Sequence, residues 1–154
     1  MNIYLSRILA ALLLLIGAST ATADATLEIS EAWVREAPPT ARMMAGYMTI
    51  NNSGDTPVSV ISISSPDYDS AEIHRTVIEE GVARMLPVRQ LEIPANSQVK
   101  LEPGGLHLML FEPKRPLPEG EAVTFIIHLD DSNSVSTISP VVRKTGEDHS
   151  HHHH

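Results

Sequence analysis

Short runs of β-branched, aromatic and other apolar residues, separated by turn-forming residues, fill this chain from Leu27 to Val142. No segment of it carries the long 3.6-residue apolar period of an amphipathic helix. Short apolar runs between Gly, Pro, Asn and Asp are instead typical of strands in a sandwich or barrel. We therefore predict an all-β, single-domain fold. The predicted strands cover residues 27–34, 45–50, 58–63, 71–78, 82–88, 98–101, 106–111, 123–129 and 135–142.

The two ends of the chain lie outside this pattern. Residues 1–23 combine one positive charge, an apolar run over 8–17 and the A-x-A cleavage pattern of residues 21–23, which together are typical of a secretory signal peptide. The apolar run is short for a membrane span, so we expect an exported protein with no span in its mature form. Cleavage would leave one domain over 24–143 and a polar, disordered tail over 144–154.

Charge and composition exclude several classes of function. The formal net charge is −8 at neutral pH, which disfavours nucleic acid or an anionic membrane surface as a partner. The chain has no cysteine. This absence excludes thiol–disulfide exchange, cysteine nucleophiles, thiolate zinc sites and blue-copper electron transfer. An exported domain without disulfides must be stabilised by its core alone.

A histidine and a methionine interrupt the apolar strand predicted over 106–111. His107 and Met109 are two residues apart, so their side chains lie on the same face of a strand. Each residue alone is more often a core or incidental residue than a ligand. Together they bring an imidazole nitrogen beside a thioether sulfur, a combination that suits Cu(I) better than hard cations, which prefer carboxylates.

A second histidine and methionine occur in a predicted hairpin upstream. If Glu80-Gly81 is a two-residue turn, Thr76 pairs with Met85. His74 is then diagonal to Met85 on one face, within reach of long side chains. A one-residue slip in register would place the two on opposite faces.

The spacing of the four residues resembles that of a known family. The pattern H-x10-M-x21-H-x-M joins His74, Met85, His107 and Met109. It is similar to the signature of the periplasmic copper chaperones called PCuAC, formerly a domain of unknown function. The stretches Gly46–Asn52 and Pro103–Leu110 resemble the family too, and the likeness covers nearly all of the chain before the tail.

This resemblance implies a cupredoxin-like, Greek-key β-sandwich in the periplasm that binds one Cu(I) near its surface. The ligands it implies are His74, Met85, His107 and Met109. It further implies delivery of copper to a cytochrome oxidase subunit, at the CuA centre, with an SCO-type assembly factor as a partner. We expect a metallochaperone and not an enzyme.

Three other functions are compatible with the sequence. The protein could sequester periplasmic copper without a dedicated delivery target. It could be a copper redox enzyme or electron carrier, although the missing cysteine argues against blue copper. It could also be an interaction domain in which the Met and His residues are incidental.

Some residues depart from the family pattern or lack an assigned role. Arg75 stands where the family commonly has Met, and on a strand it faces away from His74. Trp33 is expected to anchor the core. His128 has no Met two residues away and receives no function. A core or edge packing role is favoured over a second copper patch for Met43, Met44 and Met48.

The histidine-rich end of the chain has two interpretations. It could be an expression tag, but Ser150 interrupts the run and the signal peptide is still present, so a native tail is favoured. Clustered imidazoles bind Cu(II), Ni(II) and Zn(II), and a native tail would therefore be a secondary Cu(II) site. Its candidate ligands are His149, His151, His152, His153 and His154.

Overall fold

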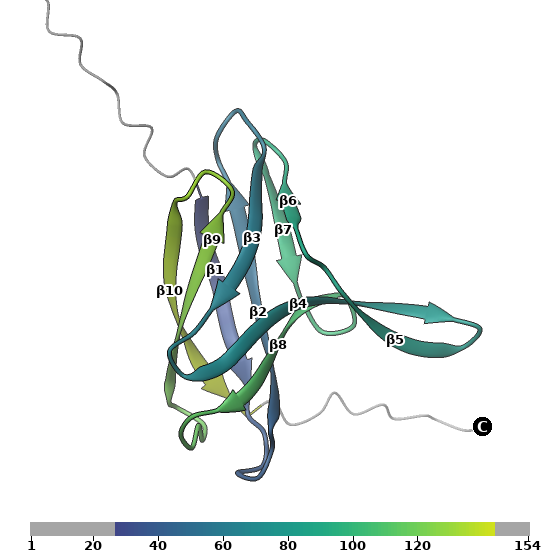
Figure 1. Cartoon of the computed structure of the whole chain (residues 1–154), viewed down its shortest axis with the longest axis vertical. Helices are drawn as coiled ribbons and strands as arrows, with labels where there is room; N and C mark the ends of the chain where they lie inside the picture. Colours follow the sequence, from purple (N-terminus) through teal and green to yellow (C-terminus); the bar gives the residue numbers. More distant parts are fainter. Residues whose placement is uncertain (1–26, 144–154) are drawn as a thin grey trace, which may run out of the picture.

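The computed structural model describes residues 27–143, and these form strands, turns and loops without a helix. Accordingly, none of the described residues belongs to a helix that could cross a membrane. The prediction of an all-β fold in one domain is confirmed, whereas its Greek-key, cupredoxin-like detail stays a prediction. The strands are β1 (Leu27–Arg35), β2 (Met43–Asn52), β3 (Val58–Ser64), β4 (Tyr68–Glu79), β5 (Val82–Pro87), β6 (Leu91–Ile93), β7 (Ser97–Leu101), β8 (Leu106–Pro113), β9 (Ala122–Leu129) and β10 (Ser134–Val142) (Figure 1).

Nine of these strands match the predicted ones within a few residues at each end. The one that the sequence did not predict is β6, which has three residues and is followed by Pro94. Its residues alternate between buried and exposed, but a run of three is too short to indicate a strand from sequence. It nevertheless pairs with β3 and buries Leu91 and Ile93 in the core.

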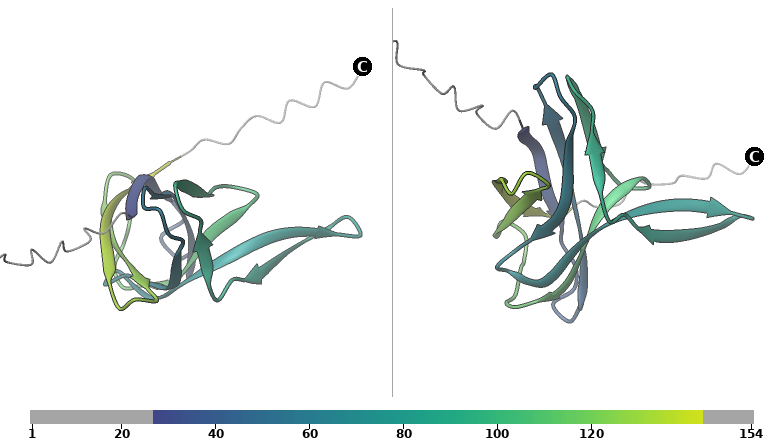
Figure 2. Two further views of the ribbon diagram at one scale, coloured as in Figure 1. Left: turned by 90° about the horizontal axis from the view of Figure 1, so that it is seen from above. Right: turned by 45° about the horizontal axis from the view of Figure 1, so that its top comes forward.

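The strands curl into a barrel-like structure. The sheet order is β5-β4-β8-β7-β2-β1-β10-β9-β3-β6, with further pairings between β4 and β3 and between β8 and β2. The β3–β4 contact, at Ile63 opposite Ala71, closes the ring. Seen from above, the strands surround a common interior (Figure 2). Closure removes most of the exposed sheet edge that an open sheet would leave.

Apolar side chains from all around the ring fill this interior. The fully buried members include Val34 on β1, Ile50 on β2 and Phe125 on β9. On β8, Leu108 and Leu110 both have no exposed surface. Because side chains alternate along a strand, His107 and Met109 belong to the opposite, outer face of β8.

The hairpin of β4 and β5 projects from the barrel as an arm (Figures 1 and 2). Its turn residues Glu80 and Gly81 have φ values of 52° and 78°, as a type I′ turn requires. Glu79 pairs with Val82, and Thr76 pairs with Met85. The predicted register of the hairpin is therefore confirmed.

Ionisation of a buried tyrosine should limit the stability of the barrel at alkaline pH. Tyr68 is 1% exposed, and its hydroxyl donates to the Met44 Sδ atom at 3.3 Å. Burial, and secondly the charge of Asp67, raise the pKa of Tyr68. The unfolded chain releases this proton near pH 10, whereas the folded chain keeps it. The contribution of Tyr68 to the free energy of unfolding is therefore fully present below about pH 10 and is lost as the pH rises further.

Urea unfolding at about pH 8 and about pH 11 tests this expectation, because the interval brackets the ordinary tyrosine pKa. The wild type should lose more free energy of unfolding over that interval than Tyr68→Phe. The other tyrosines are common to both proteins, so the difference reports Tyr68 alone. Equal losses would show that this phenol does not control the alkaline limit.

Candidate metal centre

Strands β4 and β8 place both histidines of the predicted site next to each other. His74 and His107 are direct cross-strand partners, and Glu72 is the partner of Met109. Paired residues point to the same face of an antiparallel sheet, and so do residues two apart. These four side chains therefore share the outer face, since Ile73 and Leu108, at the alternate positions, are buried in the core.

The two imidazole rings lie at a separation that one ion can bridge. Their centroids are 6.2 Å apart, with an angle of 43° between the ring planes. A ligating nitrogen lies about 2 Å from its metal, which puts the ring centre about 3 Å from that metal. Two such metal-to-ring distances together match the observed separation of the ring centroids.

The two methionines reach this face from different directions. Met109 is half-buried on β8, opposite Ala45 of β2. Met85 extends from the arm, 55% exposed, and its partner Thr76 stands two residues after His74. Both methionines therefore lie on the same sheet face as both histidines.

Hydrogen bonds fix which nitrogen of each ring is protonated. In His107, Nδ1 donates to the Gly105 carbonyl oxygen at 3.1 Å. In His74, Nε2 donates to the Glu72 Oε2 atom at 2.9 Å. A carbonyl or carboxylate oxygen only accepts, so the bonded nitrogen carries the hydrogen. In the neutral form of each ring, the lone pair is therefore on the His107 Nε2 atom and on the His74 Nδ1 atom.

Both of these lone-pair nitrogens are buried without a hydrogen-bond partner. Among the side chains of residues 27–143, the only other such atom is the Ser139 hydroxyl oxygen. Leaving a buried acceptor unpaired costs about 1–3 kcal/mol, and buried unpaired polar groups are therefore rare. Coordination of a metal ion by the two nitrogens would remove this cost.

The donor set favours a soft cation. Two imidazole nitrogens and two thioether sulfurs are neutral ligands suited to Cu(I), whereas hard cations require oxygen ligands. In the described part of the chain, no three His, Cys, Asp or Glu side chains gather to hold a metal ion. A metal site here would therefore depend on methionine sulfur.

Two groups around the histidines were missed from the sequence. Glu72 stands two residues before His74, and this spacing on a predicted strand was the available signal that the two share a face. The Gly105 carbonyl oxygen gave no signal, because a main-chain contact depends on the path of the turn. That oxygen also accepts from the Thr76 amide at 3.1 Å, so it connects the base of the arm to His107.

Three other residues named in the sequence analysis lie outside the candidate ligand set. Arg75 is exposed, and as expected it lies on the opposite face of β4 from its neighbours His74 and Thr76. His128 is bonded through Nε2 to the Ser64 hydroxyl at 2.8 Å. The expectation that Trp33 anchors the core is wrong, because it is only half-buried and stacks on Tyr47 at a centroid distance of 4.4 Å, with Arg35 over its ring.

Two of the three methionines near the second predicted strand have the expected packing role. Met44 and Met48 are buried, whereas Met43 is 49% exposed. The residues of the histidine-rich tail and of the predicted signal peptide lie outside the described part of the chain.

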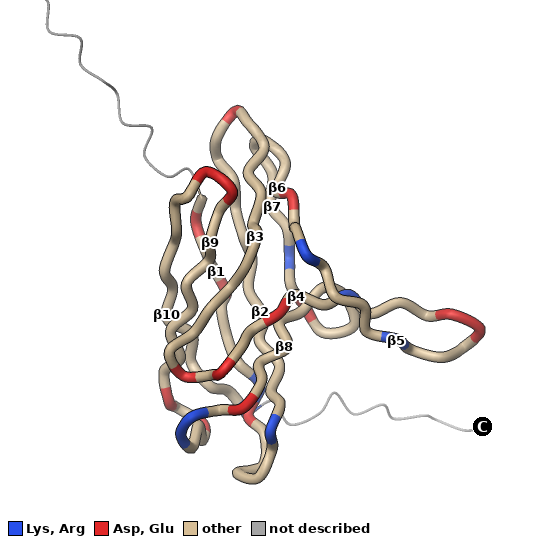
Figure 3. Tube along the Cα trace, viewed as in Figure 1, with Lys and Arg blue, Asp and Glu red and all other residues tan. Residues whose placement is uncertain are grey.

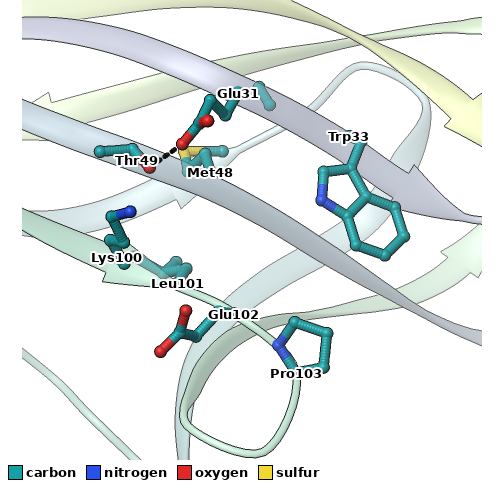
Figure 4. A pocket seen from close by; sticks show the side chains of 9 residues that line it. Glu31, Trp33, Met48, Thr49, Lys100, Leu101, Glu102 and Pro103 are labelled. Carbon is teal, nitrogen blue, oxygen red and sulfur yellow. Dashed lines mark hydrogen bonds between the residues drawn. The ribbon is translucent and has the colours of Figure 1, made fainter. Parts of the chain in front are cut away.

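A surface pocket lies elsewhere and contains none of the four candidate ligands (Figure 4). Trp33 borders it, and the carboxylate of Glu31 accepts a hydrogen bond from the Thr49 hydroxyl at 3.0 Å. The opposite side is formed by Lys100 and Glu102. A coordination site made of four side chains on one sheet face needs no such hollow, so the pocket does not define the candidate site.

Comparison with known sequences places the chain in a family. Residues 27–141 match the family described as "Putative lipoprotein LpqE-like". The "Putative lipoprotein Lxx21020" of Leifsonia xyli subsp. xyli is 30% identical over 116 residues, which cover 75% of this chain and 69% of that protein. The uncharacterized protein RP573 of Rickettsia prowazekii is also 30% identical, and the chain spans 63% of its length.

Solved structures with a similar fold are PCuAC domains and a related protein. The copper-bound PCuAC domain of PmoF2 has a TM-score of 0.65 at 23% identity, over 77% of this chain and 94% of that domain. The Cu(I)-bound solution structure of DR1885 from Deinococcus radiodurans has a TM-score of 0.59 at 32% identity, over 76% of this chain and 77% of that protein. The chain therefore belongs to the LpqE-like family, the family of the PCuAC domains, as its His and Met spacing had indicated.

Proposed function

We propose that this protein is an exported Cu(I) carrier that binds the ion through His74, Met85, His107 and Met109. The observation that carries the proposal is the pair of buried imidazole nitrogens without partners, on the sheet face that also carries both thioethers. The similarity to DR1885, whose structure was solved with Cu(I), supports copper as the cargo.

The exposure of the ligands suits release as well as binding. Met85 is 55% exposed on the arm, whereas His107 is 5% exposed. An incoming ligand of an acceptor protein can therefore replace the Met85 sulfur first, while the histidines still hold the ion. Neutral donors leave the charge of Cu(I) uncompensated, so the ion need not be held irreversibly.

The cellular setting belongs to the same proposal. Residues 1–23 act as a cleaved signal peptide, residues 24–143 form the cupredoxin-like domain, and copper is delivered in the periplasm. The acceptor is a cytochrome oxidase subunit at its CuA centre, together with an SCO-type assembly factor. The tail over 144–154 would hold Cu(II) through its histidines.

Copper sequestration is the alternative, since the same ligands would serve it. Oxidase activity in a deletion strain under low copper separates the two functions. Delivery requires that this activity fall, and that the wild-type gene restore it. Normal oxidase activity would favour sequestration.

A competitive Cu(I) titration of residues 24–146 tests binding without the histidine-rich end. One ion per molecule is expected, with both nitrogen and sulfur neighbours in X-ray absorption, because the proposed donors are two imidazoles and two thioethers. Absence of binding, or a coordination sphere without sulfur, would contradict the proposed site.

A further inference from the structure

We infer that Glu72 is a positioning residue that holds His74 in the tautomer required for metal binding. The inference deepens the proposed function and rests on it only for its copper readout. The carboxylate and the imidazole are joined by the 2.9 Å contact between Glu72 Oε2 and His74 Nε2. This contact leaves the lone pair on Nδ1, the atom that is buried without a partner.

The local backbone explains why Glu72 can take this role. Glu72 and His74 are two residues apart on β4 and share its outer face. Glu72 is also the cross-strand partner of Met109, as His74 is of His107. The carboxylate therefore lies between a histidine and a methionine of the proposed ligand set.

The Glu72 side chain is more exposed than that of His74, as expected for a residue that positions a ligand from the surface. The Glu72 side chain is 52% exposed, whereas that of His74 is 13% exposed. An exposed carboxylate contributes little to the core, so its removal should leave the fold intact. Neutral imidazole alternates between two tautomers unless a partner selects one, and partners that orient metal-binding histidines typically affect affinity about 10–100-fold.

The two histidines have opposite tautomers in this arrangement. His107 is protonated at Nδ1, because it donates to the Gly105 carbonyl, and His74 is protonated at Nε2. A main-chain carbonyl cannot be removed by substitution, but the carboxylate of Glu72 can. His107 is therefore an internal reference for any change at His74.

Nitrogen NMR of the copper-free protein tests the inference directly, since the ring shifts report which nitrogen carries the hydrogen. Spectra are recorded at about pH 8, where an ordinary histidine is neutral, and the His74 signals are assigned with His74→Asn. The wild type should show His74 protonated at Nε2. Glu72→Ala should shift His74 towards the other tautomer and leave His107 unchanged, whereas Glu72→Gln, which keeps an acceptor oxygen, should preserve the wild-type pattern.

The Cu(I) affinity of the Glu72 variants should change in the same order as the His74 tautomer. Glu72→Ala should weaken Cu(I) binding about 10–100-fold, and Glu72→Gln should retain most of the affinity. Glu79→Ala is the matched control, because it removes a carboxylate from the same strand but from the other face. The inference is overturned if Glu72→Ala leaves the His74 tautomer unchanged, or if Glu72→Gln loses as much as Glu72→Ala. Absence of copper binding in the wild type would instead refute the proposed function and leave the NMR result standing.

Discussion

His107→Ala is expected to weaken Cu(I) binding by at least about 100-fold, more than the loss typical of a residue that only orients a ligand. The substitution removes the Nε2 lone pair, which is buried and has no other partner. His107 is also the cross-strand partner of His74. The remaining donors would be a single imidazole and two thioethers, one of which is largely exposed. A competitive titration with a Cu(I) chelator measures the effect.

His128→Ala is the matched control for this experiment. His128 is an imidazole on another strand of the same barrel, bonded to the Ser64 hydroxyl, and no proposed ligand adjoins it in sequence. Its removal should leave Cu(I) affinity unchanged. Circular dichroism of both variants separates lost ligation from lost folding, since His107 is 5% exposed and leaves some space when truncated. Equal affinity of His107→Ala and the wild type would refute the site.

The strands and the hairpin register could be predicted because their causes are local. Alternating apolar residues mark a strand, and Gly81 adopts without strain one of the two positive φ values of a type I′ turn, the other being that of Glu80. Once the register was fixed, His74 and Met85 had to share a face. The acidic tip of the arm, red in Figure 3, follows from the same turn.

The features of the fold that could not be predicted depend on contacts between segments that are distant in sequence. Closure of the ring at Ile63 and Ala71 cannot be read from either strand alone. From the sequence, Trp33 is expected in the core, but Trp33 stacks on Tyr47 outside it. A positive φ of 51° at Glu31 accompanies a shift in the β1–β2 register between Ser30 and Trp33, and nothing in the sequence indicated that irregularity.

The pairing of His74 with His107 also required the structure. The sequence could place each His near a Met, but it could not align β4 with β8, which are separated by three other strands along the chain. The hydrogen bonds that select the tautomers could not be predicted from the sequence either, because they depend on the folded geometry. Burial of the two nitrogens is a property of the assembled barrel.

Leu108→Ala is expected to reduce the free energy of unfolding by about 2–5 kcal/mol, the range for a buried leucine that leaves a cavity. Leu108 has no exposed surface, and β2 approaches it closely: a Cβ atom placed on Gly46 would lie 3.4 Å from the Leu108 Cβ atom. Urea unfolding measures the loss. Ile78→Ala is the control, because Ile78 is 68% exposed on the arm and its truncation should cost less than about 0.5 kcal/mol.

The neighbouring positions 107 and 108 should therefore separate binding from folding. Under conditions where it remains folded, Leu108→Ala should still bind Cu(I), since its side chain points into the barrel and all four proposed ligands remain. Bound Cu(I) should also raise its stability, because a ligand that binds only the folded state adds to the free energy of unfolding. His107→Ala should show little or no such increase. A folded Leu108→Ala protein that has lost copper binding as completely as His107→Ala would mean that the two faces of β8 are not independent, and the assignment of one face to the core and the other to the metal would fail.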